Sequence, residues 1–375
     1  MAQTINTNVI SLNAQRNLNT SQSSLATSMQ RLSSGLRVNS AKDDAAGLAI
    51  AERMNTQVRG LNVAARNAND GISLAQTAEG ALGKISDMLQ RVRELAVQSA
   101  NATNSIDDRA ALDAEVQQLK QEIERVATTT SFNGRKILDG TFANEIFQVG
   151  ANSGETIAVP SIADAKIASL GVSTRASLNS VALSTLGTGA IAAGFTINGH
   201  DIGALGAAAN ASDRASQLVT AINAVSAASG VTAVIDTTSN TIQLNSAADI
   251  TLVDGPSTGA FGTLTATAAP TTGISSVDVL STASASQALG TVDSALDTIN
   301  SARGTLGALQ SRFENAIGNI QVTAENLSAA RGRIMDADFA AETANLSRAQ
   351  ILQQAGTAMV AQANQLPQQV LSLLK

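Results

Sequence analysis

The distribution of proline constrains the fold of this chain more than any other feature. The 375 residues contain four prolines, at Pro160, Pro256, Pro270 and Pro367. Residues 1–159 and 271–366 therefore contain none, and because proline breaks helix interiors, both flanks are free to form long helices. Aromatic residues make up only 2% of the chain, so aliphatic side chains must supply the packing. This composition favours long, thin helix–helix contacts.

The flank after Pro270 has the strongest periodicity. Apolar residues recur every seven positions, at Val292, Ile299, Leu306, Phe313, Ile320, Leu327 and Ile334. A heptad pattern over residues 289–334 predicts one coiled-coil helix. At about 1.5 Å per residue such a helix is roughly 70 Å long, which favours a rod over a compact domain.

The flank before Pro160 has matching apolar spacing. Residues 61–96 follow the same three–four pattern, with Leu82, Ile85, Leu89 and Val92 at its centre and Gly71 at one core position. We expect these residues to form a coiled coil within one subunit with Ile299, Leu306, Phe313, Ile320 and Leu327. A shorter amphipathic helix is predicted over 112–126. Ser105 and Asp108 are spaced as its N-terminal cap.

The two ends of the chain carry narrower apolar stripes. One contains Leu18, Leu25 and Leu32, and the other contains Leu352, Met359, Leu366 and Leu373. Each stripe lies on a segment rich in Asn, Gln, Ser and Ala, and neither could bury itself alone. We expect the stripes to pair with each other and with neighbouring chains. The alternative is two amphipathic helices folded back onto one core.

The middle of the chain has a different composition. Residues 142–159 alternate apolar and polar positions around the turn NSGE, which predicts a β-hairpin. Residues 177–280 contain no Lys and include four strand-like pieces, at 195–199, 231–236, 241–245 and 250–254. A helix is predicted over 212–227, with Ser212 as its cap. The fold class is therefore mainly α, with long antiparallel coiled-coil helices from both chain ends, a β-hairpin and a small α+β surface insert.

Composition and motifs argue against several functions. The net charge of −6 gives no excess of Lys and Arg for binding nucleic acid. No apolar run is long enough to span a membrane, and the N-terminus lacks the features of a cleaved secretion signal. Cysteine is absent, and His200 is the only histidine. We therefore expect no catalytic residues, no metal site and no cofactor, and we interpret His200 as a solvated loop residue.

Several longer motifs resemble those of one family. The segment QRLSSGLRVNSAKDDAAGLAIA at residues 30–51 is similar to the N-terminal signature of bacterial flagellins. The segments QRVRELAVQSAN (90–101) and SFNGRKIL (131–138) resemble flagellins further along the chain. Residues 333–374 resemble the flagellin C-terminal signature, and residues 195–254 resemble, more weakly, an insert module of many flagellins.

The resemblance implies a structural subunit that polymerises into the flagellar filament used for swimming. Residues 1–45 with 335–375 would form the inner core, residues 46–176 with 280–334 an outer helical layer with the hairpin, and residues 177–279 a surface insert. It also implies a secreted, extracellular protein exported by the flagellum itself. The implied partners are identical subunits, an export chaperone, the distal cap and the hook–filament junction proteins.

The resemblance carries a possible second role. In flagellins that animal receptors detect, the contact surface corresponds here to Arg91, Leu95 and Glu115. The alternative is that Arg91 and Glu115 are only solvated while Leu95 packs between subunits. Residues 30–51 also resemble the peptide that plant receptors detect, with Val38 in place of the more usual Ile.

The sequence leaves two other functions to consider. A flagellin-like protein of the hook–filament junction is similar at the ends, but such proteins match the signature at residues 30–51 poorly. An enzyme housed in the insert would have to work with one histidine, without cysteine and without an HExxH zinc motif.

Overall fold

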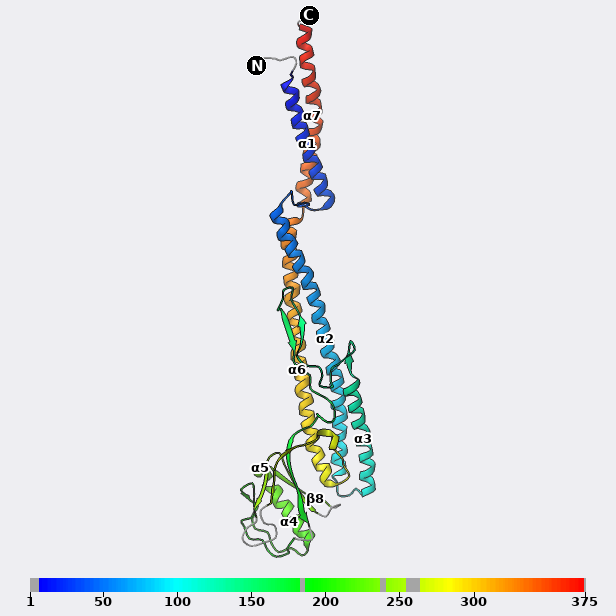
Figure 1. Cartoon of the computed structure of the whole chain (residues 1–375), viewed down its shortest axis with the longest axis vertical. Helices are drawn as coiled ribbons and strands as arrows, with labels where there is room; N and C mark the ends of the chain where they lie inside the picture. The colour runs from blue at the N-terminus through cyan, green and yellow to red at the C-terminus, as the bar shows by residue number, and fades with distance from the viewer. Residues whose placement is uncertain (1–6, 183–185, 237–240, 254–263, 374–375) are drawn as a thin grey trace. The chain divides into compact units, whose positions relative to one another are not determined.

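The computed structural model describes residues 7–182, 186–236, 241–253 and 264–373 (Figure 1). The chain forms two compact units. The first, called here the terminal unit, comprises Met1–Ala68, Gln148–Thr156 and Asn315–Lys375. The second, called the central unit, comprises Asn69–Phe147 and Ile157–Glu314. The fold is mainly helical, as the sequence predicts.

Four helices of more than 25 residues dominate the described chain. They are α1 (Val9–Ser34), α2 (Ala45–Ser99), α6 (Thr282–Met335) and α7 (Phe339–Leu373). The other helices are α3 (Ile106–Thr129), α4 (Ala211–Ala224), α5 (Ser226–Ser229) and a short 3-10 helix at Gly273–Ser276. Helices α2 and α6 begin earlier than the apolar spacing alone indicated, because their first turns consist mostly of small or polar residues. Helix α7 also includes Pro367, close to its C-terminal end.

Helices α2 and α6 pack together within the central unit. Their heptad residues are fully buried, with 0% exposure at Leu82, Ile85, Leu89, Val92, Ile299 and Phe313, and 3% at Leu306. Two polar contacts join the helices, from Arg93 Nε to Asp293 Oδ1 at 2.7 Å and from Gln310 Nε2 to Glu79 Oε2 at 2.8 Å. These contacts establish which helix faces meet.

The same two helices also meet within the terminal unit. Leu61, Ala64 and Ile320 form a small buried cluster, and Leu327 is half-buried against it. The buried small residues Ala64 and Ala68 let the two helices approach closely. This agrees with the scarcity of large aromatic side chains in the chain.

Helix α3 begins with the predicted cap. The Ser105 side chain accepts a hydrogen bond from the backbone of Asp108, and the Asp108 carboxylate accepts one from the backbone of Ser105. This reciprocal pair satisfies two donors that the first helical turn leaves free. Buried Lys120 of α3 donates to the carbonyls of Ser275 and Val277, which ties the helix to the segment before α6.

Two hairpins follow α3. Strands β1 (Ser131–Phe132) and β2 (Arg135–Lys136) are joined by Asn133 and Gly134, both with positive φ. Strands β3 (Glu145–Gln148) and β4 (Thr156–Val159) form the hairpin predicted around NSGE. The Phe147 ring of β3 packs edge-on against Phe313, with 5.6 Å between ring centroids.

The insert is a separate α+β core within the central unit. One sheet has the order β12 (Ala269–Pro270), β5 (Thr174–Ala182), β9 (Thr241–Ser246) and β8 (Val231–Asp236). The other has the order β11 (Leu264–Ala266), β10 (Ile250–Val253), β6 (Thr196–Ile197) and β7 (His200–Asp201). Helix α4 packs on β8, and its Asn223 amide exchanges two hydrogen bonds with the backbone of Ala233.

One local prediction in the insert is wrong. Ser212 was expected to cap the helix, but the cap is Asn210, whose Oδ1 accepts from the backbone N of Asp213 at 2.8 Å. The pattern is ambiguous because Asn, Ser and Asp all occur in this stretch and all favour caps. The predicted single helix also ends at Ala224, and α5 continues after Val225.

Candidate functional site

Helices α1 and α7 form an antiparallel pair in the terminal unit (Figure 1). Near the start of α1, Asn8 Nδ2 donates to the carbonyl of Ala363 at 2.8 Å, and Ser11 Oγ donates to Asn364 Oδ1 at 2.8 Å. Near the other end of the pair, Arg31 lies 3.9 Å from Glu342. Residues from opposite ends of the sequence are therefore neighbours.

The contact between α1 and α7 is built mainly from small residues. Helix α7 presents four positions spaced by seven, Glu342, Ala349, Gly356 and Ala363. Three of them are buried, and a Cβ added to Gly356 would lie 3.1 Å from Leu18 Cδ1. On α1, Ser11 and Ser28 are buried, while Leu18, Leu25 and Leu32 are half-buried. Small side chains let the two backbones approach closely.

The larger apolar residues of α7 stay exposed. Leu352 is 50% exposed and Met359 is 60% exposed. The side chains of Leu366 and Leu373 lie outside the described residues, so only their backbone is placed in α7. Other apolar side chains of the terminal helices are also at least half exposed, namely Val9, Ile10, Leu12, Met29, Phe339 and Ile351. The two predicted stripes therefore differ, since the one on α1 is half-buried and the described side chains of the one on α7, Leu352 and Met359, are exposed.

Backbone contacts tie the end of α1 to the start of α7. Helix α1 ends at Ser34 and is capped by Gly35, which has φ +71°. The N–H of Ala337 donates to the Gly35 carbonyl at 2.9 Å, and the N–H of Arg37 donates to the Met335 carbonyl at 2.6 Å. The break after α1 and the break before α7 therefore form one joint.

Arg91, Glu115 and Leu95 occupy different environments. Arg91 Nε donates to Glu115 Oε1 at 2.8 Å, and Arg91 Nη1 donates to Glu94 Oε2 at 2.9 Å. These carboxylates raise the pKa of Arg91, with the hydrogen bond to Glu115 as the main cause. Arg91 and Glu115 are exposed, whereas Leu95 is only 1% exposed. A direct contact with Leu95 would require its side chain to leave the core.

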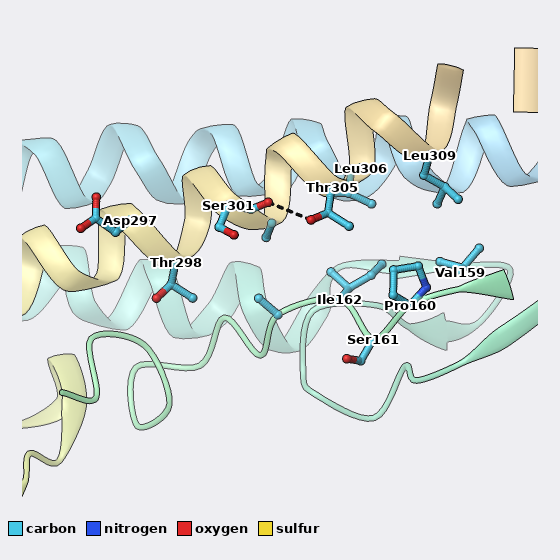
Figure 2. A pocket seen from close by; sticks show the side chains of 12 residues that line it. Val159, Pro160, Ser161, Ile162, Asp297, Thr298, Ser301, Thr305, Leu306 and Leu309 are labelled. Carbon is cyan, nitrogen blue, oxygen red and sulfur yellow. Dashed lines mark hydrogen bonds between the residues drawn. The ribbon is translucent and has the colours of Figure 1, made fainter. Parts of the chain in front are cut away.

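A groove of about 490 Å³ lies in the central unit between the segment after β4 and one face of α6 (Figure 2). Val159, Pro160 and Ile162 form one wall, and Thr298, Ser301 and Thr305 stand on α6 opposite them. Asp297 is the one ionisable residue among the described residues lining it. A single carboxylate among aliphatic and hydroxyl groups lacks the second titratable group that acid–base catalysis uses.

The described residues also offer few groups that could form a catalytic or metal-binding site. His200 is exposed in β7. Within the described ranges there is no group of three or more His, Cys, Asp or Glu that could hold a metal ion. None of the helices in these ranges is both long and apolar enough to cross a membrane.

Comparison with known proteins decides the family. The bacterial flagellin N-terminal helical region matches residues 5–143, and the C-terminal helical region matches residues 289–374. The B-type flagellin of Pseudomonas aeruginosa is 40% identical, and Flagellin A of Vibrio anguillarum is 43% identical, each with 100% of both chains covered. The chain belongs to the bacterial flagellin family. It is a structural subunit of the flagellar filament and not an enzyme.

This flagellin is also similar to one further family model and to a solved flagellin structure. The flagellin hook IN motif matches residues 194–248, which cover most of the insert core. A crystal structure of Bacillus cereus flagellin is 24% identical, with a TM-score of 0.35, and the match covers 71% of this chain and 94% of that one.

Sequence reasoning missed one part of the contact between α1 and α7 in this flagellin. The pattern Glu342, Ala349, Gly356, Ala363 also repeats every seven residues, but it is nearly invisible to a search for large apolar residues. A search for small residues at heptad spacing would have found the face of α7 that meets α1.

Proposed function

We propose that copies of this flagellin polymerise through the exposed apolar side chains of α1 and α7. The observation that carries the proposal is that Leu352 and Met359 remain at least half exposed although α7 is already paired with α1. Exposed apolar residues that line one helix commonly mark an interaction surface. In a filament subunit, the available partner for such a surface is another subunit.

The energetic argument supports the same proposal. Fully burying a Leu or Met side chain contributes about 1.5–3 kcal/mol relative to leaving it exposed. The pair of α1 and α7 leaves Leu18, Leu25 and Leu32 only half-buried. Leu352 and Met359 are at least half exposed, so apolar burial within the pair is incomplete. Contacts to Leu352, Met359 and their exposed neighbours would add most of the remaining apolar burial.

A polymerisation trial of Met359→Asp tests this function. We expect the variant to stay monomeric under conditions in which the unaltered chain forms filaments, because a carboxylate at this position would be buried without a partner. Gln354→Asp is the matched control, since Gln354 is an exposed polar residue of the same helix. Filaments of Met359→Asp with normal yield and length, seen by electron microscopy, would count against the proposal.

We also propose the layer assignment that the resemblance implies. Residues 1–45 with 335–375 form the inner core, residues 46–176 with 280–334 the outer helical layer, and residues 177–279 the surface insert. The separate hydrophobic core of the insert, from Ala176 to Leu252, supports treating it as a distinct domain. Deletion of 177–279 should leave filament formation intact, and electron microscopy would check this.

The proposed route to the filament includes several partners. The chain is secreted through the flagellar export apparatus, bound beforehand by an export chaperone, and assembled between the junction proteins and the distal cap. Exposed apolar residues of α7 such as Ile351, which is 66% exposed, give a chaperone a surface to cover before export. Loss of chaperone binding in Met359→Asp, measured with purified proteins, would support this assignment.

A second proposed function is recognition by host flagellin receptors. The exposed pair of Arg91 and Glu115, joined at 2.8 Å, presents adjacent opposite charges on α2 and α3 and supports this role. Arg91→Ala should weaken receptor activation by monomer in a cell reporter assay. Arg125→Ala is the control, because Arg125 is exposed and its ion pair is with Glu122 of its own helix. Equal activation by both variants would argue against a contact at Arg91.

A further inference from the structure

The terminal helices carry few charges, and most of these lie in one groove. The charged residues of α1 are Arg16 and Arg31, and those of α7 are Glu342 and Arg348. A groove of about 450 Å³ between the two helices is lined by Arg31, Glu342 and Arg348, together with hydroxyl residues of α1 such as Ser24. Three of the four charges therefore converge on a single groove.

Charge pairing in this groove is incomplete. Glu342 is only 7% exposed, and its carboxylate lies 3.9 Å from Arg31 Nη1, too far for a hydrogen bond. Arg31 Nε is buried and has no hydrogen-bond partner among the described residues. Arg348 is exposed, and in the described part of the chain it makes no ion pair. Glu342 is therefore the one carboxylate among the described residues that line the groove, beside two guanidinium groups. Asp43 of the same chain also interacts electrostatically with Arg31, but it is exposed and lies outside the groove lining, so Arg348 is left without a carboxylate among the lining residues.

The missing carboxylate has to come from outside the terminal helices. Residues 1–34 and 339–375 contain one acidic residue, Glu342 itself. The nearest acids along the chain are Asp43, Asp44, Asp336 and Asp338.

Three of these acids already have partners. Asp43 accepts from the backbone of Ser40, Asp44 accepts from the N–H of Gly47, and Asp338 accepts from the N–H of Ala340. Asp336 differs, because it is exposed and its carboxylate accepts no hydrogen bond from the described residues.

We propose that the groove lined by Arg31, Glu342 and Arg348 receives the Asp336 carboxylate of a second copy of the chain. The added carboxylate would lie against the two guanidinium groups and leave the groove electrically neutral. A partly buried guanidinium gains more from a carboxylate than an exposed one does, because solvent screens the pair less. The inference rests on the proposed polymerisation through α1 and α7, and it adds a polar contact to the apolar one.

The test is a charge swap in the full-length chain. The critical concentration for polymerisation is measured by sedimentation, with electron microscopy of the pellets. Arg348→Glu should raise the critical concentration about fivefold or more, the effect of losing roughly 1 kcal/mol per subunit. The double variant Arg348→Glu with Asp336→Arg should return it to near the original value, because the two charges are exchanged.

Arg16→Glu is the matched control, since it makes the same charge change on α1 outside the groove. Asp336→Arg should rescue Arg348→Glu and should not rescue any loss seen in Arg16→Glu. An unchanged critical concentration in Arg348→Glu, or a loss that Asp336→Arg does not rescue, would overturn the inference. If Met359→Asp blocks assembly in the same series, polymerisation through the apolar side chains of α1 and α7 remains supported even when the charge swap fails.

Discussion

At the scale of single residues, the absence of a side chain at Gly71 leaves space for the Phe313 ring between α2 and α6. A Cβ at this position would lie 2.6 Å from Cζ of Phe313, whose ring is fully buried. The sequence placed Gly71 at a core position of the heptad pattern. It could not show that the Phe313 ring fills the space, because that depends on the register between α2 and α6.

Gly71→Ala should therefore destabilise the central unit. The added methyl group would force the ring or the helices to move, which costs about 1–3 kcal/mol in a well-packed core. Gly80→Ala is the control in the same helix, because no atom lies within 4 Å of its added Cβ. That change should stabilise the helix by about 0.5–1 kcal/mol. Urea unfolding checks both, and equal effects of the two changes would contradict this packing.

Arg214 was not recognisable as important from sequence. It looks like a surface residue of a polar helix, yet it is 0% exposed. Its guanidinium donates to the carbonyls of Gly187, Thr188 and Gly189 and to Gln217 Oε1. Only the fold of the segment around 187–189 makes these carbonyls available, and no local pattern encodes that.

Arg214→Met should destabilise the insert by about 3 kcal/mol, because the carbonyls of residues 187–189 would lose a charged donor that is itself buried. The long helices have their own core, so their unfolding transition should change little. Ser216→Ala, at an exposed site of α4, serves as control. Limited proteolysis and thermal unfolding would report the effect, and an unchanged insert would show that the Arg214 hydrogen bonds are dispensable.

At the scale of elements, apolar periodicity predicted where the long helices lie in the sequence better than it predicted which faces of them meet. The heptad residues of α2 and α6 in the central unit are buried, and large apolar residues mark both faces of that contact. The face of α7 that meets α1 was missed, because it is marked by Ala, Gly and a single Glu. Strands of two or three residues such as β11 and β12 are too short to give a pattern.

The cap of α3 gives a pH-dependent prediction. Hydrogen bonds from the hydroxyl and N–H of Ser105 lower the pKa of Asp108 below its ordinary value. A carboxyl whose pKa is lower in the folded state stabilises the fold above its unfolded pKa, and this stabilisation is lost as the pH falls through the folded value. Asp108→Ala should therefore reduce the free energy of unfolding at neutral pH.

The difference in the free energy of unfolding between the original chain and Asp108→Ala should shrink as the pH falls below about 4. The unfolded state binds the proton first, and the folded state binds it once the pH falls through its lower pKa. Unfolding by urea, followed by circular dichroism at a series of pH values, measures this difference. A difference that stayed constant down to pH 2 would contradict the proposed role of the carboxylate.

At the scale of the whole molecule, the exposed apolar side chains of α1 and α7 are the surface through which we propose that subunits assemble. The pair between these helices buries small residues, so its ordering should depend on neighbours in the filament. Limited proteolysis should trim roughly residues 1–45 and 335–375 from dilute monomer and leave the same segments intact in filaments. Equal protection of the ends in dilute monomer would argue against ordering on assembly.

The most direct test of the assembly surface uses the absence of cysteine. Met359→Cys introduces a single thiol into the chain at a site that is 60% exposed in the monomer. Its labelling rate with a water-soluble thiol reagent is measured in monomer and in filaments. We predict rapid labelling in monomer and strong protection in filaments. Equally fast labelling in both states would show that Met359 faces solvent in the filament and would contradict the account.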